Sequence, residues 1–440
     1  MGEHRREVLP NGLRVLLVEN PSLHSFVCSV YVRAGARFEA PERTGLSHFL
    51  EHMLLQGSEN YPTFLDIMRS VEDLGGVVDG QTHSEYMKLA FGVHRKHWRS
   101  VMKVVADVIM RPLFDKGEVK QEKSIITQEI SRHRDRKGRN ISVYELAYEL
   151  LLKEKLDEAG SRGSPQIMAG FDREMVLEHY RRFFVPENMV LCLAGGVGAG
   201  EALEEVRGCF APLRGGDGPP ELVAPDVKSM RARSIYRETE ARPIVEALLC
   251  HRAYPLGHDR FDAFRAVSHL LGGGLTSRLF TRVREELGLV YDVGAYPQGY
   301  SDVGSLDVSF SVDVKNLVPA FEAVLDVMGE VAGENFTADE LGRYKESARC
   351  GMEILCDNAA HVADWFGKQE LLLGGDRVLS PEDYIARQEA LTLDSLRQAL
   401  DEALTHSGAN LAVAGPFADE QKRRMCELFP AEEAETKAEG

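Results

Sequence analysis

Residues 188–212 read NMVLCLAGGVGAGEALEEVRGCFAP, a pattern that predicts a strand, a tight turn and an amphipathic helix ending at Phe210. Residues 409–431 read ANLAVAGPFADEQKRRMCELFPA and follow the same plan, with their helix ending at Phe429. Each copy has an Ala-Gly pair after its strand; the two pairs are 220 residues apart and the two phenylalanines 219. This spacing indicates a chain built by internal duplication.

A second pair of segments supports the duplication. Residues 87–109 and 306–328 each change from alternating apolar residues to helical spacing at the same place, again at an offset of 219. Residues 8–19 predict a hairpin that turns at Asn11-Gly12. We therefore expect an α+β fold of two homologous domains, each a mainly antiparallel sheet with helices packed on one face.

The domain boundaries follow from length and composition. A chain of 440 residues exceeds what one core usually supports. The stretch 214–226 is rich in Gly and Pro and predicts a linker. We expect an N-terminal domain at 1–213, a C-terminal domain at 227–431, and a disordered tail at 432–440.

Composition excludes several classes of protein. The formal net charge of −17 argues against a nucleic-acid-binding surface, and no segment is long and apolar enough to span a membrane. The first residues lack the apolar region of a secretory signal. Seven dispersed cysteines without a CxxC motif are typical of reduced thiols, so we expect a cytoplasmic protein.

The stretch 47–57, SHFLEHMLLQG, carries the candidate chemistry. On a helix, His48 and His52 lie on one face about one turn apart, close enough for two imidazoles to bind one cation, and Glu51 lies beside them. A hydrolytic zinc site needs three protein ligands, and the third is commonly a carboxylate. The alternative is that these residues are polar side chains on an otherwise apolar helix.

A third ligand is available in residues 117–130, GEVKQEKSIITQEI. Glu122 and Glu129 are seven residues apart, so both carboxylates lie on one face of a helix. One could bind a metal while the other holds a ligand in place. Glu118 could equally belong to the set, and helical glutamates are more often simply solvated.

At this point the sequence resembles a known family. HxxEH is the inverted zincin motif, and its context resembles that of the pitrilysin/insulinase metallopeptidases. A second motif, at 269–293, is similar to the family's Gly-rich segment followed by an Arg and a Tyr, here Arg284 and Tyr291. The resemblance covers nearly the whole chain and is greatest to the half-length branch that includes the mitochondrial processing peptidase subunits.

The resemblance implies roles for seven residues: zinc ligands His48, His52 and Glu129, general base Glu51, supporting carboxylate Glu122, and substrate contacts Arg284 and Tyr291. The implied reaction is peptide-bond hydrolysis by a zinc-activated water. Mn²⁺ or Co²⁺ would fit the same ligands. The second half has no HxxEH, since only His269 falls near the matching helix and Ala348 stands at the third ligand's position, so we expect one zinc site.

In this family the substrate binds as an added strand at a sheet edge, and the matching segment is 75–91. Its candidate substrate-binding residues are Asp79, Gly80, Gln81 and Thr82. Where relatives usually have Asn-Ala, this chain has Asp79-Gly80, which keeps backbone pairing possible and would favour cationic peptides. The nearby His83 is expected to be an ordinary strand residue.

Family members of this length enclose a chamber between two subunits. We expect an endopeptidase for peptides and unfolded segments, working as a homodimer in which Arg284 and Tyr291 of one chain complete the zinc site of the other. A heterodimer with a related subunit is the alternative assembly. The alternative functions are a leader-peptide processing subunit and a non-catalytic scaffold of the same fold.

Overall fold

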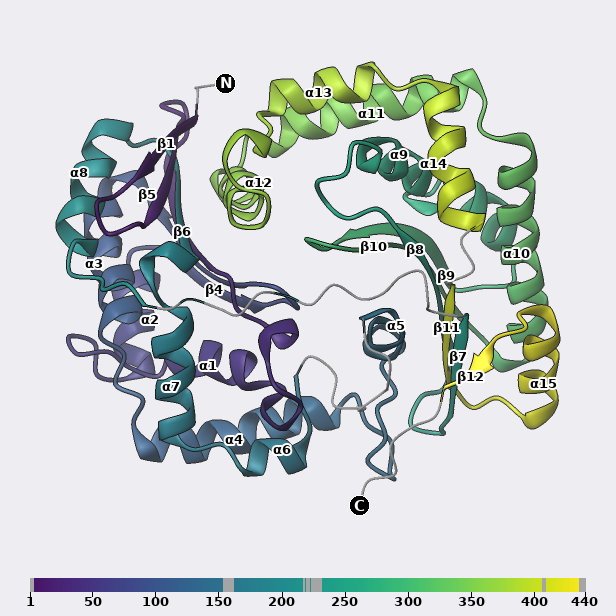
Figure 1. Cartoon of the computed structure of the whole chain (residues 1–440), viewed down its shortest axis with the longest axis horizontal. Coiled ribbons are helices and arrows are strands. Elements are labelled where there is room, and N and C mark those ends of the chain that lie inside the picture. The colour runs from purple at the N-terminus through teal and green to yellow at the C-terminus, as the bar shows by residue number, and fades with distance from the viewer. Residues whose placement is uncertain are drawn as a thin grey trace. The chain divides into compact units, whose positions relative to one another are not determined.

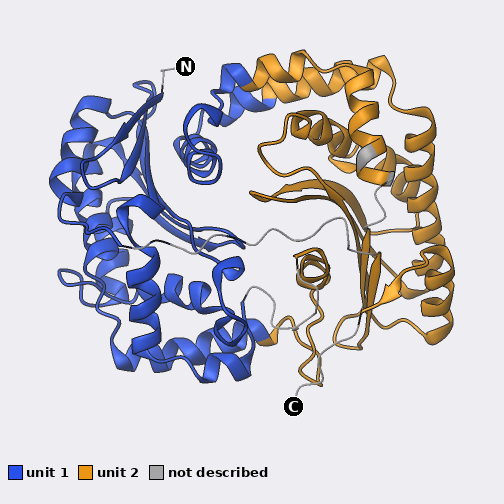
Figure 2. Cartoon of the chain, viewed as in Figure 1, with its two compact units in different colours: residues 1–130, 161–222, 351–383 blue, residues 131–160, 223–350, 384–440 orange. Residues whose placement is uncertain are grey.

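Two compact units make up the chain, each built around one sheet (Figure 1). The computed structural model describes residues 4–152, 162–216, 218, 222, 232–405 and 409–434. Unit 1 comprises residues 1–130, 161–222 and 351–383, and unit 2 comprises 131–160, 223–350 and 384–440 (Figure 2). Among the described residues, no helix is long and apolar enough to cross a bilayer.

The sheet of unit 1 has six strands in the spatial order β1-β2-β6-β3-β5-β4. Their bounds are β1 His4–Val8, β2 Arg14–Glu19, β3 Ser25–Val32, β4 Val77–Thr82, β5 Met87–His94 and β6 Met189–Gly195. Only β2 and β6 run parallel; the other neighbours are antiparallel. Strand β4 is therefore an edge strand that pairs only with β5.

Helices cover both faces of this sheet. Unit 1 contains α1 Leu46–Leu54, α2 Phe64–Glu72, α3 Trp98–Met110, α4 Lys116–Ser131 (whose last residue falls in unit 2), α6 Pro165–Ala169, α7 Arg173–Phe183, α8 Ala199–Phe210 and α12 Ala359–Leu372. Alternate residues of β2 explain the two layers. Val15 and Leu17 join the large core with helices α1 to α4 and α6 to α8, whereas Leu16 and Val18 join a second core with α12.

Unit 2 repeats this plan. Its sheet has the order β12-β7-β11-β8-β10-β9, formed by β7 Arg233–Glu238, β8 Val245–Ala253, β9 Asp292–Gly299, β10 Gly304–Val312, β11 Asn410–Gly415 and β12 Glu432–Glu433. Its helices are α5 Val143–Leu152, α9 Phe261–Gly272, a π-helical segment Phe280–Glu286, α10 Leu317–Glu334, α11 Ala338–Leu355, α13 Pro381–Glu389, α14 Leu393–Thr405 and α15 Asp419–Leu428, of which α11 and α13 each include residues of unit 1. The predicted α+β fold of two similar, mainly antiparallel domains is confirmed.

The two halves of the chain exchange a helix, which the sequence did not predict. Helix α5, from the first half, packs on β8 and β11 of unit 2 through Leu146 and Leu150, and α12, from the second half, packs on β3 and β6 of unit 1 through Val362 and Phe366. Each exchanged helix lies on the face of its sheet opposite the other helices, so the expected one-face packing describes only the larger layer.

The exchange also means that neither unit is continuous in sequence, in contrast to the expected division at 213 and 227. Most of the expected linker 214–226 lies outside the described residues. The expected tail 432–440 begins with β12, and residues 435–440 lie outside the described part of the chain.

Candidate metal centre and active site

Helix α1 presents the HxxEH motif beneath the edge of the unit 1 sheet. Phe49, Leu50 and Met53 on its apolar face are fully buried in the large core. His48 and His52 project from another side and remain partly exposed, with side-chain exposures of 11% and 25%. A helix anchored in the core by one face is a rigid support for ligands on the other.

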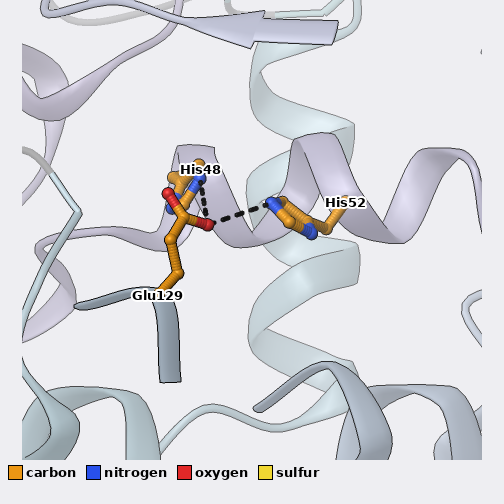
Figure 3. Close-up of side chains that lie close together, drawn as sticks. All are labelled: His48, His52 and Glu129. Carbon is orange, nitrogen blue, oxygen red and sulfur yellow. Dashed lines mark ion pairs between the residues drawn. The ribbon is translucent and has the colours of Figure 1, made fainter. Parts of the chain in front are cut away.

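Helix α4 supplies a carboxylate to these two histidines. Oε2 of Glu129 lies 3.7 Å from Nε2 of His48 and 3.9 Å from Nε2 of His52, and Figure 3 shows both rings projecting toward it. One ligand atom from each of the three residues lies within 4.8 Å of the other two. Within the described part of the chain, this is the only such group of His, Cys, Asp and Glu side chains.

The second glutamate of α4 holds His52 from the opposite side of its ring. Oε2 of Glu122 lies 3.1 Å from Nδ1 of His52, and its Oε1 accepts a hydrogen bond of 2.8 Å from Gln56. A donor bond from Nδ1 leaves Nε2 of His52 free to bind a cation, which is how metal-binding histidines are usually oriented. Glu118, the alternative candidate, does not belong to the group.

The electrostatics of the two histidines differ. Burial, assisted by the charges of His52 and Arg162, lowers the pKa of His48 to about 3, so this ring is neutral, as a metal ligand must be. Burial alone would also lower the pKa of His52. The hydrogen bond to Glu122 and the charges of Glu51 and Glu129 outweigh that effect, and the net shift of its pKa is upward.

His48, His52 and Glu129 are called the metal-ligand group from here on. Glu51 lies between this group and the edge strand β4. Its Oε2 accepts a hydrogen bond of 2.7 Å from the Thr82 hydroxyl, and its Oε1 lies 2.5 Å from where a Cβ on Gly80 would be. Burial raises the pKa of Glu51, and the Thr82 bond and His52 oppose the rise. This carboxylate beside the candidate metal centre is placed to accept a proton in a hydrolytic reaction.

Two further contacts were missed from the sequence. Nε of Arg162 lies 3.3 Å from Oε1 of Glu129 and so fixes the third ligand, although Arg162 is 33 residues further along the chain. Gln56 belongs to the same quoted stretch as the motif, one turn beyond His52, and that spacing could have identified it as a contact to Glu122.

Asp79 and Gln81 lie on the edge strand β4, and His83 follows its last residue. Asp79 and Gln81 lie on the exposed side of β4 and are hydrogen-bonded to each other at 2.9 Å. The His83 ring stacks on Tyr86 with centroids 4.4 Å apart, and the metal-ligand group does not include it.

Arg284 and Tyr291 lie close together in unit 2. Arg284 belongs to the π-helical segment, and its guanidinium lies 5.8 Å from the centre of the Tyr291 ring. Tyr291 precedes β9, the edge strand that matches β4, and its side chain is 77% exposed. π-Helical turns are rare and are frequent at functional sites. The pair is therefore available to a ligand.

The donor set fits a divalent transition metal. Two imidazole nitrogens and one carboxylate oxygen are the ligands of hydrolytic zinc sites, and Zn²⁺, Mn²⁺ and Co²⁺ all accept them. The Nδ1 contact of His52 and the neutral state of His48 agree with this assignment. The roles of the individual residues stay predictions.

Comparisons with known proteins agree with the geometry. Residues 14–157 match the family model "Insulinase (Peptidase family M16)", and residues 170–348 match "Peptidase M16 inactive domain". The second match agrees with the expectation of a single zinc site in the first half.

Similar proteins span nearly the whole chain. An uncharacterized zinc protease of Bacillus subtilis is 26% identical over 94% of this chain and 98% of its own length, and one of Streptomyces coelicolor is 26% identical over 96% and 93%. Among solved structures, a protease from Helicobacter pylori has a TM-score of 0.87 at 16% identity, covering 94% of this chain and 99% of that one. The first half of the periplasmic protease PqqL from Escherichia coli has a TM-score of 0.74 at 18% identity, covering 96% and 93%.

Proposed function

Because this chain belongs to the M16 family of insulinase-type peptidases, we propose that it is a zinc-dependent endopeptidase that hydrolyses peptides and unfolded segments. The observation that carries the proposal is the convergence of His48, His52 and Glu129 on one point. Relatives named zinc proteases support the choice of metal. A scaffold role accounts less well for a complete set of ligands.

In the proposed reaction, Glu51 moves the proton. The chemistry that bound zinc supplies is Lewis acidity toward water and the peptide carbonyl. Glu51 takes the proton of the attacking water and passes it to the leaving amine nitrogen, a step that contributes typically 10²- to 10⁴-fold. The Thr82 hydrogen bond holds the carboxylate in place, and Glu122 does the same for the ring of His52.

The substrate is proposed to add to the sheet of unit 1 as a further strand. Strand β4 leaves its outer edge unpaired among the described strands, and Gly80 and Thr82 on that strand border Glu51. Backbone hydrogen bonds of an added strand would bring its peptide groups to the general base whatever their sequence. Asp79 is exposed and would favour a cationic side chain at the neighbouring position.

We also propose that two chains form the working enzyme and enclose a chamber around the substrate. Support comes from the length of the chain, which matches that of the first half of the PqqL protease, and from the exposed Tyr291 with the half-buried Arg284 beside it. In a homodimer these two residues of one chain complete the zinc site of its partner. A cytoplasmic location stays a prediction, which cell fractionation would test.

The first test compares wild type with Glu51→Gln. Bound metal is measured by elemental analysis, and cleavage of an internally quenched peptide is measured with and without chelator. We expect about one zinc ion per chain in both proteins and chelator-sensitive cleavage by wild type alone. Wild type that binds zinc but cleaves no peptide contradicts the peptidase proposal, and wild type without metal contradicts the zinc site as well.

The two-chain arrangement has its own test. Mixing Arg284→Ala with Glu51→Gln should restore activity, because one of the two mixed sites then has an intact zinc site and an intact Arg-Tyr pair. Mixing Glu51→Gln with Glu122→Gln is the matched control, since both changes fall on the zinc side and no mixed site regains a full set. Equal activity in both mixtures would exclude an active site shared between chains.

A chamber also predicts that unfolded casein is cut and a tightly folded protein is spared.

A further inference from the structure

The first turn of helix α1, which carries His48 and His52, is not capped by the side chain of the residue before it. The residue before helix α1 is Gly45, which has a positive φ of 94° and no side chain to cap the helix. A side chain is excluded there, because a Cβ on Gly45 would lie 2.3 Å from the Arg162 carbonyl oxygen. The first turn of α1 therefore has free backbone N–H groups that its own capping residue cannot satisfy.

Glu39, six residues before Gly45, supplies the hydrogen-bond acceptors for these N–H groups. Its Oε2 accepts a hydrogen bond of 2.7 Å from the Gly45 N–H, and its Oε1 accepts one of 2.5 Å from the Ser47 N–H. One carboxylate thus binds two backbone groups at the positive end of the helix, where its negative charge is also favoured.

A second contact restrains the same turn from its side chain. The buried Ser47 hydroxyl lies 2.9 Å from Nε2 of His179 on helix α7. Ser47 immediately precedes His48, so both restraints act at the residue next to the first histidine of the metal-ligand group. Arg162, whose carbonyl oxygen excludes a side chain on Gly45, also contacts Glu129 through its guanidinium.

We propose that Glu39 is a positioning residue for metal binding: by capping the first turn of α1 it sets the direction of His48 toward Glu129. Glu39 does not belong to the metal-ligand group and has no part in the proton transfer, so its effect is on metal affinity. The inference rests on the proposed zinc site and adds a residue that the HxxEH motif does not contain.

The test measures the zinc affinity of metal-free protein by competition with a chromophoric chelator. Contacts that orient metal ligands typically change affinity about 10- to 100-fold, so Glu39→Ala should weaken zinc binding by that factor and Glu39→Gln by less, since its amide keeps one acceptor oxygen. Glu42→Gln is the matched control, because Glu42 is an exposed glutamate three residues away from Glu39. Higher free zinc should restore full metal content in the Glu39 variants.

Folding is followed separately by the unfolding midpoint of each metal-free protein. Should Glu39→Ala fail to fold, Ser47→Ala examines the same turn without a change of charge and should also weaken zinc binding. Wild-type affinity in a folded Glu39→Ala overturns the inference, as does wild-type affinity in Ser47→Ala where Glu39→Ala does not fold, and so does an equal loss in Glu42→Gln. Zinc binding without peptide cleavage overturns the proposed function alone, whereas wild type without zinc affinity overturns both.

Discussion

Oε2 of Glu122 lies 3.1 Å from Nδ1 of His52, on the side of the ring away from Glu129. The Glu122 side chain is 2% exposed, and Gln56 donates to its other oxygen. Glu122 thus fixes the ring of His52 without belonging to the metal-ligand group. In the proposed zinc site, Glu122 and Glu129 of α4 therefore have different roles: Glu129 as a ligand and Glu122 as the support of His52.

Glu122→Gln should therefore lower zinc affinity by about 10- to 100-fold while leaving the proposed ligands in place. A glutamine amide at position 122 can still contact His52. It carries no negative charge, however, to offset the lowering of the His52 pKa by burial. Chelator competition measures the effect, with Glu118→Gln as control, since Glu118 lies one turn away on the same helix. Equal zinc affinity in wild type and Glu122→Gln would show that this contact is unimportant for the metal.

Gly80→Ala should reduce kcat severalfold with little change in KM. The new Cβ would lie 2.5 Å from Oε1 of Glu51, and the Thr82 bond to the other oxygen limits how far the carboxylate can move away. Steady-state kinetics on the quenched peptide measure the change. Gly200→Ala is the control because a Cβ there has nothing within 4 Å. Unchanged kcat in Gly80→Ala would mean that Glu51 can shift without loss.

Glu340→Gln should destabilise the protein at neutral pH and much less in acid. Both oxygens of Glu340 bind Arg278, at 2.8 and 2.9 Å, and the pair holds the pKa of Glu340 at about 2, below the ordinary 4.5. The stabilisation is therefore complete above about pH 4.5 and is lost as the pH falls toward 2.

Thermal unfolding midpoints at several pH values test this linkage. The gap between wild type and Glu340→Gln should narrow steadily below pH 4.5, whereas Glu353→Gln, an exposed change on the same helix, should follow wild type throughout. A gap that stays constant down to pH 2 would show that the ion pair is not the source of the stabilisation.

Much of this architecture could be predicted from the sequence because it rests on periodicity. The repeat at an offset near 220 predicted matching strand and helix pairs, and they occur as β6 with α8 and β11 with α15. The HxxEH spacing predicted two histidines on one helix face, and the seven-residue spacing of Glu122 and Glu129 predicted that α4 would present both to them.

Other features depend on tertiary contacts that no local pattern records. Helix α5 has apolar residues suited to covering a sheet, but nothing in 143–152 states which sheet it covers. Arg162 contacts Glu129, and Glu39 caps α1, only because loops bring them there. Glu39 carries no sign of its role, since an isolated glutamate outside a helix is usually solvated.

The helix exchange bears on how such a chain could have arisen. A single ancestral repeat would have left one face of its own sheet uncovered, because the helix that covers that face comes from the other copy. Two identical copies could satisfy each other by trading this helix, which is the arrangement of a domain-swapped dimer. Fusion of the two genes would then have made the trade permanent within one polypeptide. After that, one copy could keep the proposed metal ligands while the other lacked them, since each copy still supplied a helix to its neighbour's sheet.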